Sequence, residues 1–479
     1  MHQIFARNYP SLDPDALLAT CSQARPMRRW LPVCIALLLS SPVAASEADE
    51  QALRAELEAL RTRLEQIEAK LSASTPPPVA SPQPTPASGP TVTLDKRGLS
   101  VRDDGNGFEF KLRGGLQLDH REFFGDDRVG ADGSFTFRRI RPTLEGKLGT
   151  LAAFRITPEL AGDNVTLLDA WIDLNISPVF GLRFGRMKGP VSLERLVSFS
   201  ALPMIERGYA SELAPNRVLG VQGFGSLAAG KVQYALGVFN GGPDGRNDAS
   251  IDGDSHVDIQ GRLFFEPWRG DASALAGLGF GLAATLGDRD GSGNNFLPRY
   301  RTPGQDVFFS HRNGVEAHGD HARWSPQLYW YHRSFGLLAE HIVSRQNLRL
   351  ASDPASKTRL EHSAWSVTGS WVLTGEKASY RGIGDPSSPF VVGGGNWGAF
   401  ELVGRLGELD VDDDAFPLLA NPDTAASRAR SWGLGLNWYL NSNVKLQFDH
   451  QRTHFDGGAS GGADRADERT FFSRVQLSF

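Results

Sequence analysis

The sequence predicts an all-β fold, a transmembrane antiparallel β-barrel of about 16 strands that follows a short coiled-coil helix and a proline-rich linker. Three observations support this prediction. From residue 91 to residue 479, apolar and polar residues alternate with a period of two, as in strands with one apolar and one polar face. Short links such as "NISPV" alternate with long Gly- and Asp-rich links such as "NGGPDGRNDASIDGDS" and "TGEKASYRGIGDPSSPFVVGGGNW", which predicts one tight edge and one edge with long loops. An export signal precedes the region, and together these features are typical of an outer-membrane barrel.

Residues 1–45 read as an N-terminal extension and a signal peptide. The stretch "MRRWLPVCIALLLSSPVAAS" begins at Met27 with two arginines, continues as an apolar run and closes on small residues, which is the pattern of a secretory signal. We expect translation to start at Met27 and cleavage to follow Ala45. An N-terminal anchor is the alternative, but the apolar run is too short to span a bilayer as a helix. Both cysteines of the chain, Cys21 and Cys34, lie in this segment, so the exported product would contain no thiol.

Residues 46–72 predict a coiled-coil helix. Apolar residues recur at alternating steps of four and three, while Glu and Arg fill the other faces. Because fewer than four heptads are marginal alone, we expect this helix to pair with partner chains; a lone solvated helix is the alternative. Residues 73–90 follow as a proline-rich linker that cannot pack a core. The residues of the predicted seam are Leu53, Leu57, Leu60, Leu64, Ile67 and Leu71.

Residues 91–479 form the predicted barrel domain. The stretch "GFEFKLRGGLQLDH" alternates apolar and charged residues, and the chain ends in a similar strand, "RTFFSRVQLSF". A soluble β-sandwich is the alternative, but it would need neither so many charged residues on the second face nor loops of unequal length. Lysine and arginine number 50 against 55 acidic residues, for a net charge of −5. This balance gives no reason to expect a nucleic-acid partner.

A barrel of this size encloses water, and its inward residues decide what passes. The strand "TFRRIRPTLEGKL" carries Arg138, Arg139 and Arg141 within four positions. In a regular strand Arg138 would face away from the other two. If all three arginines face the lumen, the strand must be bulged or twisted near them, and we expect this irregularity at Pro142.

The link "RMKGPVSLERLVSFSALPMIERGYASELAPNR", residues 186–217, is far longer than a hairpin needs. It is amphipathic, and long loops with apolar content usually fold onto a surface. We expect this loop to lie against the inner wall of the barrel; an external loop packed on its neighbours is the alternative. Its charged residues would then lie in the lumen. They are Lys188, Glu194, Arg195, Glu206 and Arg207.

The residues now show a family resemblance. The segments "FKLRGGLQLD", "FRRIRPTLEGKL", "NVTLLDAWIDL", "LRFGRMKGPVSLERLVSFSALPMIERG", "LAPNRVLGVQG", "NGGPDG", "YRGIGDP" and "LGLNWYLNSNVKLQFDH" resemble, in this order, the phosphate-selective porin O and P family. The resemblance covers most of residues 100–479. It implies a trimer of 16-stranded barrels in a Gram-negative-type outer membrane, with the third loop folded inward. It also implies an anion-selective pore with arginines at its narrowest point and a ladder of basic residues leading to it.

The same resemblance implies roles for individual residues. The arginine pair of the family's eyelet falls on Arg138 and Arg139, and the carboxylate that faces the pair falls on Asp169. The basic residue of the inward loop falls on Arg195, where phosphate-specific members have lysine, and Ser198 matches a serine beside it. Physically, guanidinium groups offer planar donors that fit the oxygens of phosphate or carboxylate. A solvated barrel wall with no selectivity is the alternative interpretation of the arginine cluster.

Two departures separate this sequence from the phosphate-specific members. Phe199 stands where they have a second serine, and Arg113 precedes the double glycine of the first strand instead of following it. Anion passage is therefore better supported than phosphate specificity. The candidate ladder residues are Lys111, Arg113, Arg299 and Arg301.

Other chemistry is sparse in this sequence. The histidines are scattered, and neither "HGDH" at 318–321 nor the acidic run at 410–414 has the partners of a metal site. We expect no cofactor, no metal and no enzymatic activity. The expected partners are small inorganic anions such as phosphate, outer-membrane lipid and two further copies of the chain. A pore for another solute, such as pyrophosphate, organic anions or sugars, and an envelope tether that contacts peptidoglycan through the helix remain as alternatives.

Overall fold

The computed structural model describes residues 47–73, 89–124, 133–248 and 254–479. The predicted signal peptide and most of the predicted linker lie outside these ranges. The chain divides into two compact units, Met1–Thr85 and Pro86–Phe479. In the first unit, α2 (Glu47–Ala73) is a continuous helix. Four residues of its predicted seam, Leu57, Leu60, Leu64 and Ile67, are more than half exposed, so pairing with another chain stays a prediction. No helix in the described part of the chain is long and apolar enough to cross a membrane.

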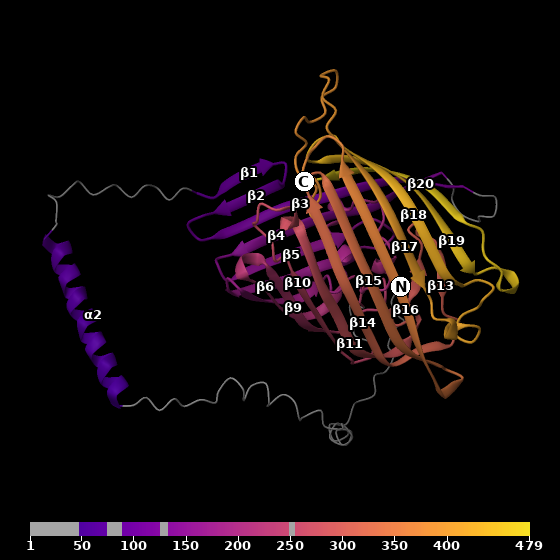
Figure 1. The fold of residues 1–479 in the computed structure, drawn as a ribbon, viewed down its shortest axis with the longest axis horizontal. Coiled ribbons are helices and arrows are strands. Elements are labelled where there is room, and N and C mark those ends of the chain that lie inside the picture. The colour runs from indigo at the N-terminus through magenta and orange to yellow at the C-terminus, as the bar shows by residue number, and fades with distance from the viewer. Residues whose placement is uncertain (1–46, 74–88, 125–132, 249–253) are drawn as a thin grey trace, which may run out of the picture. The chain divides into compact units, whose positions relative to one another are not determined.

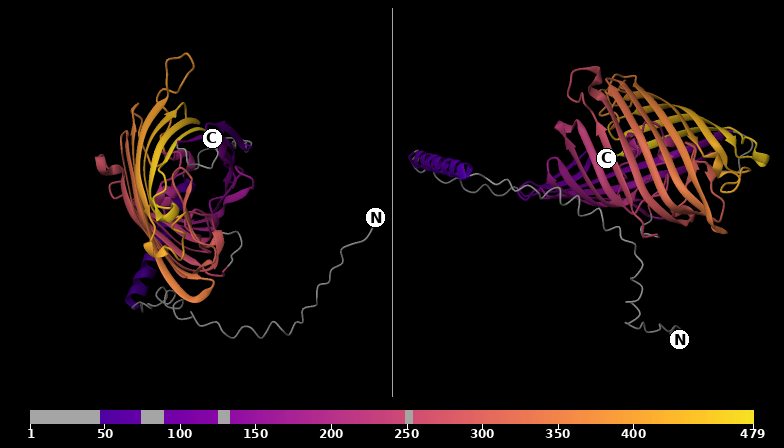
Figure 2. Two further views of the ribbon diagram at one scale, coloured as in Figure 1. Left: turned by 90° about the vertical axis from the view of Figure 1, so that its right-hand side faces the viewer. Right: turned by 60° about the horizontal axis from the view of Figure 1, so that its bottom comes forward.

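The second unit is a closed antiparallel barrel of 16 strands (Figures 1 and 2). Neighbours along the chain pair in order, and the last strand pairs with the first to close the ring. The fold class predicted from the alternating pattern is therefore confirmed. The barrel strands are β3 (Phe108–Phe124), β4 (Ser134–Leu148), β5 (Ala152–Glu159), β6 (Thr166–Ser177), β7 (Phe180–Met187), β8 (Val218–Leu227), β9 (Val232–Phe239), β10 (Asp258–Phe265), β11 (Leu278–Ser292), β14 (Val315–His332), β15 (Phe335–Leu350), β16 (Asp353–Val372), β17 (Ala399–Asp410), β18 (Ala426–Tyr439), β19 (Val444–Gly457) and β20 (Glu468–Ser478).

The remaining elements are short. They are β1 (Thr91–Asp95), β2 (Gly98–Asp103), β12 (Arg299–Arg301), β13 (Val307–Ser310), the one-turn helix α3 (Leu193–Leu196) and the 3₁₀ turns η2 (Phe199–Ala201), η3 (Tyr209–Glu212), η4 (Ala228–Gly230), η5 (Ala274–Gly277), η6 (Gly293–Asn295), η7 (Asp413–Ala415) and η8 (Ser460–Gly462).

The closure of the barrel involves the C-terminal residue. β3 pairs with β2 over its first residues, 108–112, and with β20 over residues 115–124. Between these ladders, Gly114 and Phe479 exchange two backbone hydrogen bonds of 2.9 and 3.0 Å. A Cβ on Gly114 would lie 2.7 Å from the Phe479 ring. A glycine at this position therefore lets the terminal aromatic ring pack directly on the seam.

The two faces of the strands have opposite character. On β20, Phe471 and Val475 are exposed on the outside, whereas Arg474 and Gln476 are buried on the inside. Most other strands follow the same rule, with apolar residues facing outwards, as a lipid-facing surface requires, and polar residues facing the lumen. The exceptions are buried apolar residues of β15, β16 and β19, such as Ile342, Leu360 and Phe455, which pack against links inside the lumen. The inward positions are the ones from which a site can be built.

The wall of the barrel is uneven in height. β14, β15 and β16 have 18, 16 and 20 residues, whereas β5, β7, β9 and β10 have 8 each. The long strands form one side of the barrel in Figure 1, and the short strands form the other. We call the side formed by β4–β10 the low wall, after its four short strands, and the side formed by β14–β20 the tall wall. The low wall carries most of the inward arginines described below.

One loop lies at an unexpected end of the barrel. The pattern of the sequence groups the link "TGEKASYRGIGDPSSPFVVGGGNW", within residues 373–398, with the long loops of one edge. Strand order instead places it between β16 and β17, at the end that carries the short turns and the C-terminus (Figure 1). The prediction of one tight edge and one edge with long loops is wrong at this link. The length of a link does not show at which end of the barrel it lies. The end follows from the number of strands that precede the link, because successive strands run in opposite directions.

Candidate functional site

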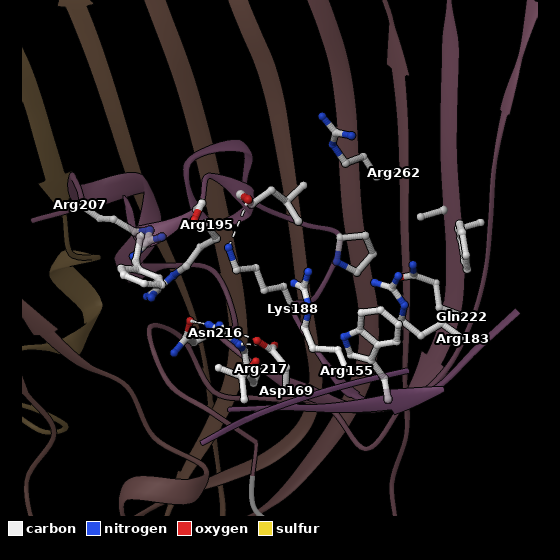
Figure 3. Close-up of a pocket in the computed structure, with 18 of the residues that line it drawn as sticks. Arg155, Asp169, Arg183, Lys188, Arg195, Arg207, Asn216, Arg217, Gln222 and Arg262 are labelled. Atoms are coloured by element: carbon white, nitrogen blue, oxygen red, sulfur yellow. Dashed lines mark hydrogen bonds and ion pairs between the residues drawn. The ribbon is translucent and has the colours of Figure 1, made fainter. Parts of the chain in front are cut away.

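A cavity of about 840 Å³ lies inside the barrel. Its walls come from β4–β10 and from residues 188–217, the link between β7 and β8, which we call the inward loop. Figure 3 shows Lys188, Arg195, Arg207 and Arg217 arranged around this space, with Arg155 and Arg183 farther along its wall. The basic residues that line the cavity are Arg138, Arg139, Arg141, Arg155, Arg183, Lys188, Arg195, Arg207, Arg217, Arg262, Arg301 and Arg381, and the acidic ones are Asp169, Glu206 and Glu212.

A bulge in β4 brings three arginines to the cavity. In the β3–β4 ladder, Gln117 pairs with Arg139 and Leu118 pairs with Phe137, so Arg138 is an extra residue. The bulge allows Arg138 to reach the lumen together with Arg139 and Arg141. The predicted bulge is confirmed, but it lies at Arg138 and not at Pro142. Pro142 pairs regularly on one side with Gly114, and on the other side the β4–β5 ladder ends two residues away, at Leu144.

Glu206 of the inward loop is the counter-charge of the arginine pair. Arg138 donates two hydrogen bonds to the Glu206 carboxylate, and Arg139 donates a third at 3.4 Å. Arg121 and Arg474 approach the same carboxylate at 3.0 and 3.7 Å. Burial opposes the ionisation of Glu206, but the charges of Arg138 and Arg139 outweigh it and hold the pKa of this carboxyl well below its usual range.

Asp169, expected to face the arginine pair, forms its ion pair with Arg217 and not with Arg138 or Arg139. Asp169 is on β6 and accepts a hydrogen bond of 3.0 Å from Nε of Arg217. It lines the same cavity as Arg138 and Arg139, but these two arginines form their ion pairs with Glu206 of the inward loop. The charge of the loop residue was visible in the sequence, whereas its position opposite β4 depends on how the loop folds.

The opposite wall holds the inward loop through its backbone. Glu340 on β15 accepts hydrogen bonds from the Ser192 hydroxyl and from the backbone N–H groups of Leu193 and Glu194, at 2.9, 2.9 and 3.1 Å. Backbone groups inside a protein need such partners, and the inward polar residues of the tall wall supply them. Four more side chains of this wall donate hydrogen bonds to carbonyl oxygens of the loop: Lys445 to Leu202, Asn437 to Pro203, Arg474 to Ile205 and Arg405 to Glu206. In the other direction, the backbone N–H of Ile205 donates to Asp449.

A second link also enters the lumen. The β12–β13 hairpin carries Tyr300, Phe308 and Phe309, all fully buried. The Phe308 ring lies 6.2 Å from that of Phe455 on β19, and the Tyr300 ring lies 5.4 Å from that of His362 on β16. This apolar packing fills the lumen on the side of the tall wall and leaves the cavity next to the low wall.

Arg195 and Ser198, the predicted loop residues of the site, both line the cavity. The Arg195 guanidinium donates to the carbonyl oxygens of Ser211, at 2.5 and 3.0 Å, and Gly245, at 3.1 Å, and it is mostly buried. It therefore ties the inward loop to the β9–β10 link. The Ser198 hydroxyl lies 3.0 Å from that of Ser200. The structure thus brings Arg138, Arg139, Asp169, Arg195 and Ser198 to one cavity, with different partners from those expected.

The candidate ladder residues do not stay together. Lys111 and Arg113 face inwards on β3 but form ion pairs with Glu109 and Glu145, at 2.9 and 2.7 Å. Neither residue lines the cavity. On β12, Arg301 lines it and Arg299 does not. The proposed ladder therefore keeps one member at the cavity.

Sequence reasoning missed several cavity residues of the low wall. Arg155 and Arg183 form ion pairs with Glu145 and Asp173, at 2.5 and 2.6 Å. Both guanidinium groups also lie against the Trp171 ring, at 5.5 and 3.9 Å from its centroid. The alternation of inward and outward residues could have identified Arg155 and Arg183, because they occupy inward positions of β5 and β7. Within the described residues, no group of three or more His, Cys, Asp or Glu side chains could hold a metal ion.

Comparison with known proteins adds to this geometry. Residues 110–479 match the family described as phosphate-selective porin O and P. Porin O of Pseudomonas aeruginosa is 24% identical over an alignment of 424 residues that covers 81% of this chain and 94% of that protein. An anion-selective porin from Comamonas acidovorans covers 78% of this chain and 100% of its own, with 13% identity and a TM-score of 0.48. OmpT of Vibrio cholerae covers 78% and 98%, with 9% identity and a TM-score of 0.47. With the family match extending over most of its length, the chain belongs to the phosphate-selective porin O and P family and is an outer-membrane porin, a channel and not an enzyme.

Proposed function

We propose that this porin is an anion-selective channel for the passive diffusion of phosphate or similar small anions. The observation that carries the proposal is the excess of basic over acidic side chains around the cavity: twelve basic residues face three acidic ones. Three further acids, which do not line the cavity, pair with its arginines: Glu145 with Arg155, Glu159 with Arg141 and Asp173 with Arg183. The twelve basic residues still outnumber all six acids. The net field in the cavity therefore favours anions and repels cations.

The strength of this field is large enough to select ions. Two unit charges 4 Å apart interact by about 4 kcal/mol at an effective dielectric constant of roughly 20. One unneutralised cation at the cavity wall is therefore sufficient to exclude a passing potassium ion at short range. Guanidinium and ammonium groups also supply hydrogen bonds that replace part of the hydration shell of an anion. Arg138, Arg139 and the inward loop would together form the constriction.

A pore for a larger organic anion is the second candidate. Phe199 favours it, because its ring lies at the cavity and the Arg141 guanidinium stacks on it at 5.0 Å. An aromatic surface beside cations suits an anion with an apolar body better than it suits inorganic phosphate. Pyrophosphate and sugars remain further alternatives for the solute.

The assembly that we propose is a homotrimer. Strands that span a membrane need about 9–11 residues, and four strands of the low wall have only 8. Packing against another copy would cover this wall. The exposed stripe of α2 could clamp the trimer or contact peptidoglycan. Deleting residues 46–90 should then weaken the trimer in cross-linking experiments, and unchanged trimers would count against this role of the helix.

Single-channel recording tests the channel proposal. Chloride current through the reconstituted protein should fall when millimolar inorganic phosphate is added. Replacing both Arg138→Gln and Arg139→Gln removes two positive charges and leaves Glu206 with fewer partners, so the preference for anions should fall several-fold. Unchanged selectivity in this double variant would reject the arginine constriction. The same current measured with pyrophosphate or benzoate as competitor separates the two candidate solutes.

A further inference from the structure

A groove of about 430 Å³ lies on the outer surface of the tall wall, outside the lumen. Leu406 on β17 lines it between Trp365 on β16 and Trp432 on β18. All three side chains face outwards and are at least 37% exposed. Because β17 is the middle strand of the three, one indole ring lies on each side of the leucine. The groove therefore offers an apolar surface bordered by two aromatic rings.

The groove lies at one edge of the lipid-facing band. Toward the C-terminal ends of β16 and β18, Val367 and Leu434 continue the apolar outer face to a second pair of tryptophans, Trp371 and Trp438. Rows of aromatic residues mark both membrane interfaces of an outer-membrane barrel. The second pair lies toward the end that carries the short turns, which is the periplasmic end. The groove therefore opens at the level of the headgroups of the outer leaflet.

Basic side chains border the groove at this headgroup level. Arg430 on β18 and both Arg452 and His454 on β19 line it. Arg469 on β20 lies directly opposite Arg452 in the β19–β20 ladder, and both side chains are exposed on the outer face. Like charges directly opposite each other destabilise a sheet. An anion held between these two guanidinium groups removes that repulsion.

The carboxylates of this surface meet only part of the positive charge. They belong to Glu408, Asp456 and Asp467. Arg430 forms an ion pair of 2.8 Å with Asp456, and Arg452 forms one of 2.6 Å with Asp467. Among the residues that the structure describes, Arg469 has no ion-pair partner. Since exposed ion pairs add little to stability, a ligand with more than one phosphate group can contact Arg452 and Arg469 together without breaking a strong internal interaction.

We propose that this groove binds a phosphorylated glycolipid of the outer leaflet, whose headgroup carries two phosphate groups above its acyl chains. The phosphate groups contact Arg430, Arg452 and Arg469, because guanidinium groups fit phosphate oxygens. An acyl chain lies on Leu406 between the two indole rings, which favour the boundary between acyl chains and headgroups. The site lies outside the lumen, so it does not depend on the ion selectivity of the channel.

Native mass spectrometry of the detergent-solubilised exported protein, titrated with diphosphoryl lipid A, tests this site. The wild type should bind lipid A more tightly than phosphatidylcholine, which has acyl chains but no net charge. In the Arg452→Gln/Arg469→Gln variant, the apparent dissociation constant for lipid A should rise at least about fivefold, while that for phosphatidylcholine stays unchanged. Arg97→Gln/Arg102→Gln is the matched control, because it removes two exposed arginines of the β1–β2 hairpin, at the periplasmic end; it should bind lipid A as the wild type does.

Further measurements distinguish a lipid from a free anion. Trp432→Ala removes one aromatic border of the groove and should also weaken the binding of lipid A, whereas millimolar inorganic phosphate should not displace lipid A from the wild type. All variants should keep the wild-type channel conductance, which shows that the barrel is folded. Equal affinity of the wild type for lipid A and phosphatidylcholine overturns the site, as does unchanged affinity for lipid A in Arg452→Gln/Arg469→Gln or in Trp432→Ala. Displacement of lipid A by inorganic phosphate overturns it as well, because the cations then serve a free anion.

Discussion

The two sides of the barrel lumen use the same kind of residue for different purposes. On the tall wall, Glu340, Asp449 and Lys445 face inwards and bond to the backbone of the inward loop. On the low wall, Arg138 and Arg183 also face inwards, but they line an open cavity. The alternating pattern marks both sets as inward and polar. Whether such a residue anchors a loop or faces the solute depends on which wall the loop covers.

The largest expected effect comes from releasing the loop from the tall wall. Glu340→Ala removes the carboxyl group that accepts three hydrogen bonds from residues 192–194 and leaves their donors without this partner, which costs roughly 1–3 kcal/mol for each buried donor. The start of the inward loop should then leave the wall, so single-channel conductance should rise and ion selectivity should fall. Glu361→Gln, which alters an exposed ion pair with Arg345, serves as the control. Wild-type conductance in Glu340→Ala would show that other contacts suffice to hold the loop.

The next effect concerns the low wall. Glu206→Gln should leave four guanidinium groups around a neutral amide and raise the positive charge of the cavity. We expect the anion-to-cation permeability ratio to rise several-fold and phosphate to block chloride current at lower concentration. Asp169→Asn is the matched comparison, because it frees Arg217 and leaves Arg138 paired with Glu206. If Asp169→Asn alone strengthens the block, Asp169 is the acid that governs the arginine pair, contrary to the structure.

A smaller effect should follow a change in how the loop meets β3. A Cβ on Gly115 would lie 2.2 Å from the Phe199 ring, so Gly115→Ala must displace this ring from the wall. We expect a modest change in conductance with the anion preference retained. The double variant Gly115→Ala/Phe199→Leu, whose smaller side chain leaves room for the added methyl group, should recover the wild-type conductance. Gly115→Ala with wild-type current would show that the ring can shift without affecting the path.

The smallest effect is a dependence on pH. Burial and the charges of Arg217 and Arg207 lower the pKa of Lys188. This ammonium is charged below the lowered pKa and loses its charge as the pH rises through it. Block of chloride current by sulfate, which remains divalent over this range, should weaken at a pH below the ordinary titration of lysine near about 10.4. Lys188→Arg should keep the block constant over the same range, because guanidinium remains charged. Identical pH profiles for the two proteins would exclude Lys188 as the titrating group.

Much of this organisation could be predicted from the sequence, and the failures are instructive. The alternation of residues predicted the barrel, and the crowding of Arg138, Arg139 and Arg141 predicted a bulge, because a regular strand cannot direct all three to one side. The pairing of Arg138 and Arg139 with Glu206 could not be predicted, since it depends on the path of a loop with no repeating pattern. Arg155 was missed although its inward position was available from the period of two.

The most direct test of the anion channel is the reversal potential of the wild-type protein in a tenfold gradient of potassium chloride across a planar bilayer. The net positive field of the cavity predicts a potential close to the equilibrium value for chloride. A potential with the sign expected for potassium selectivity would contradict the account at its centre.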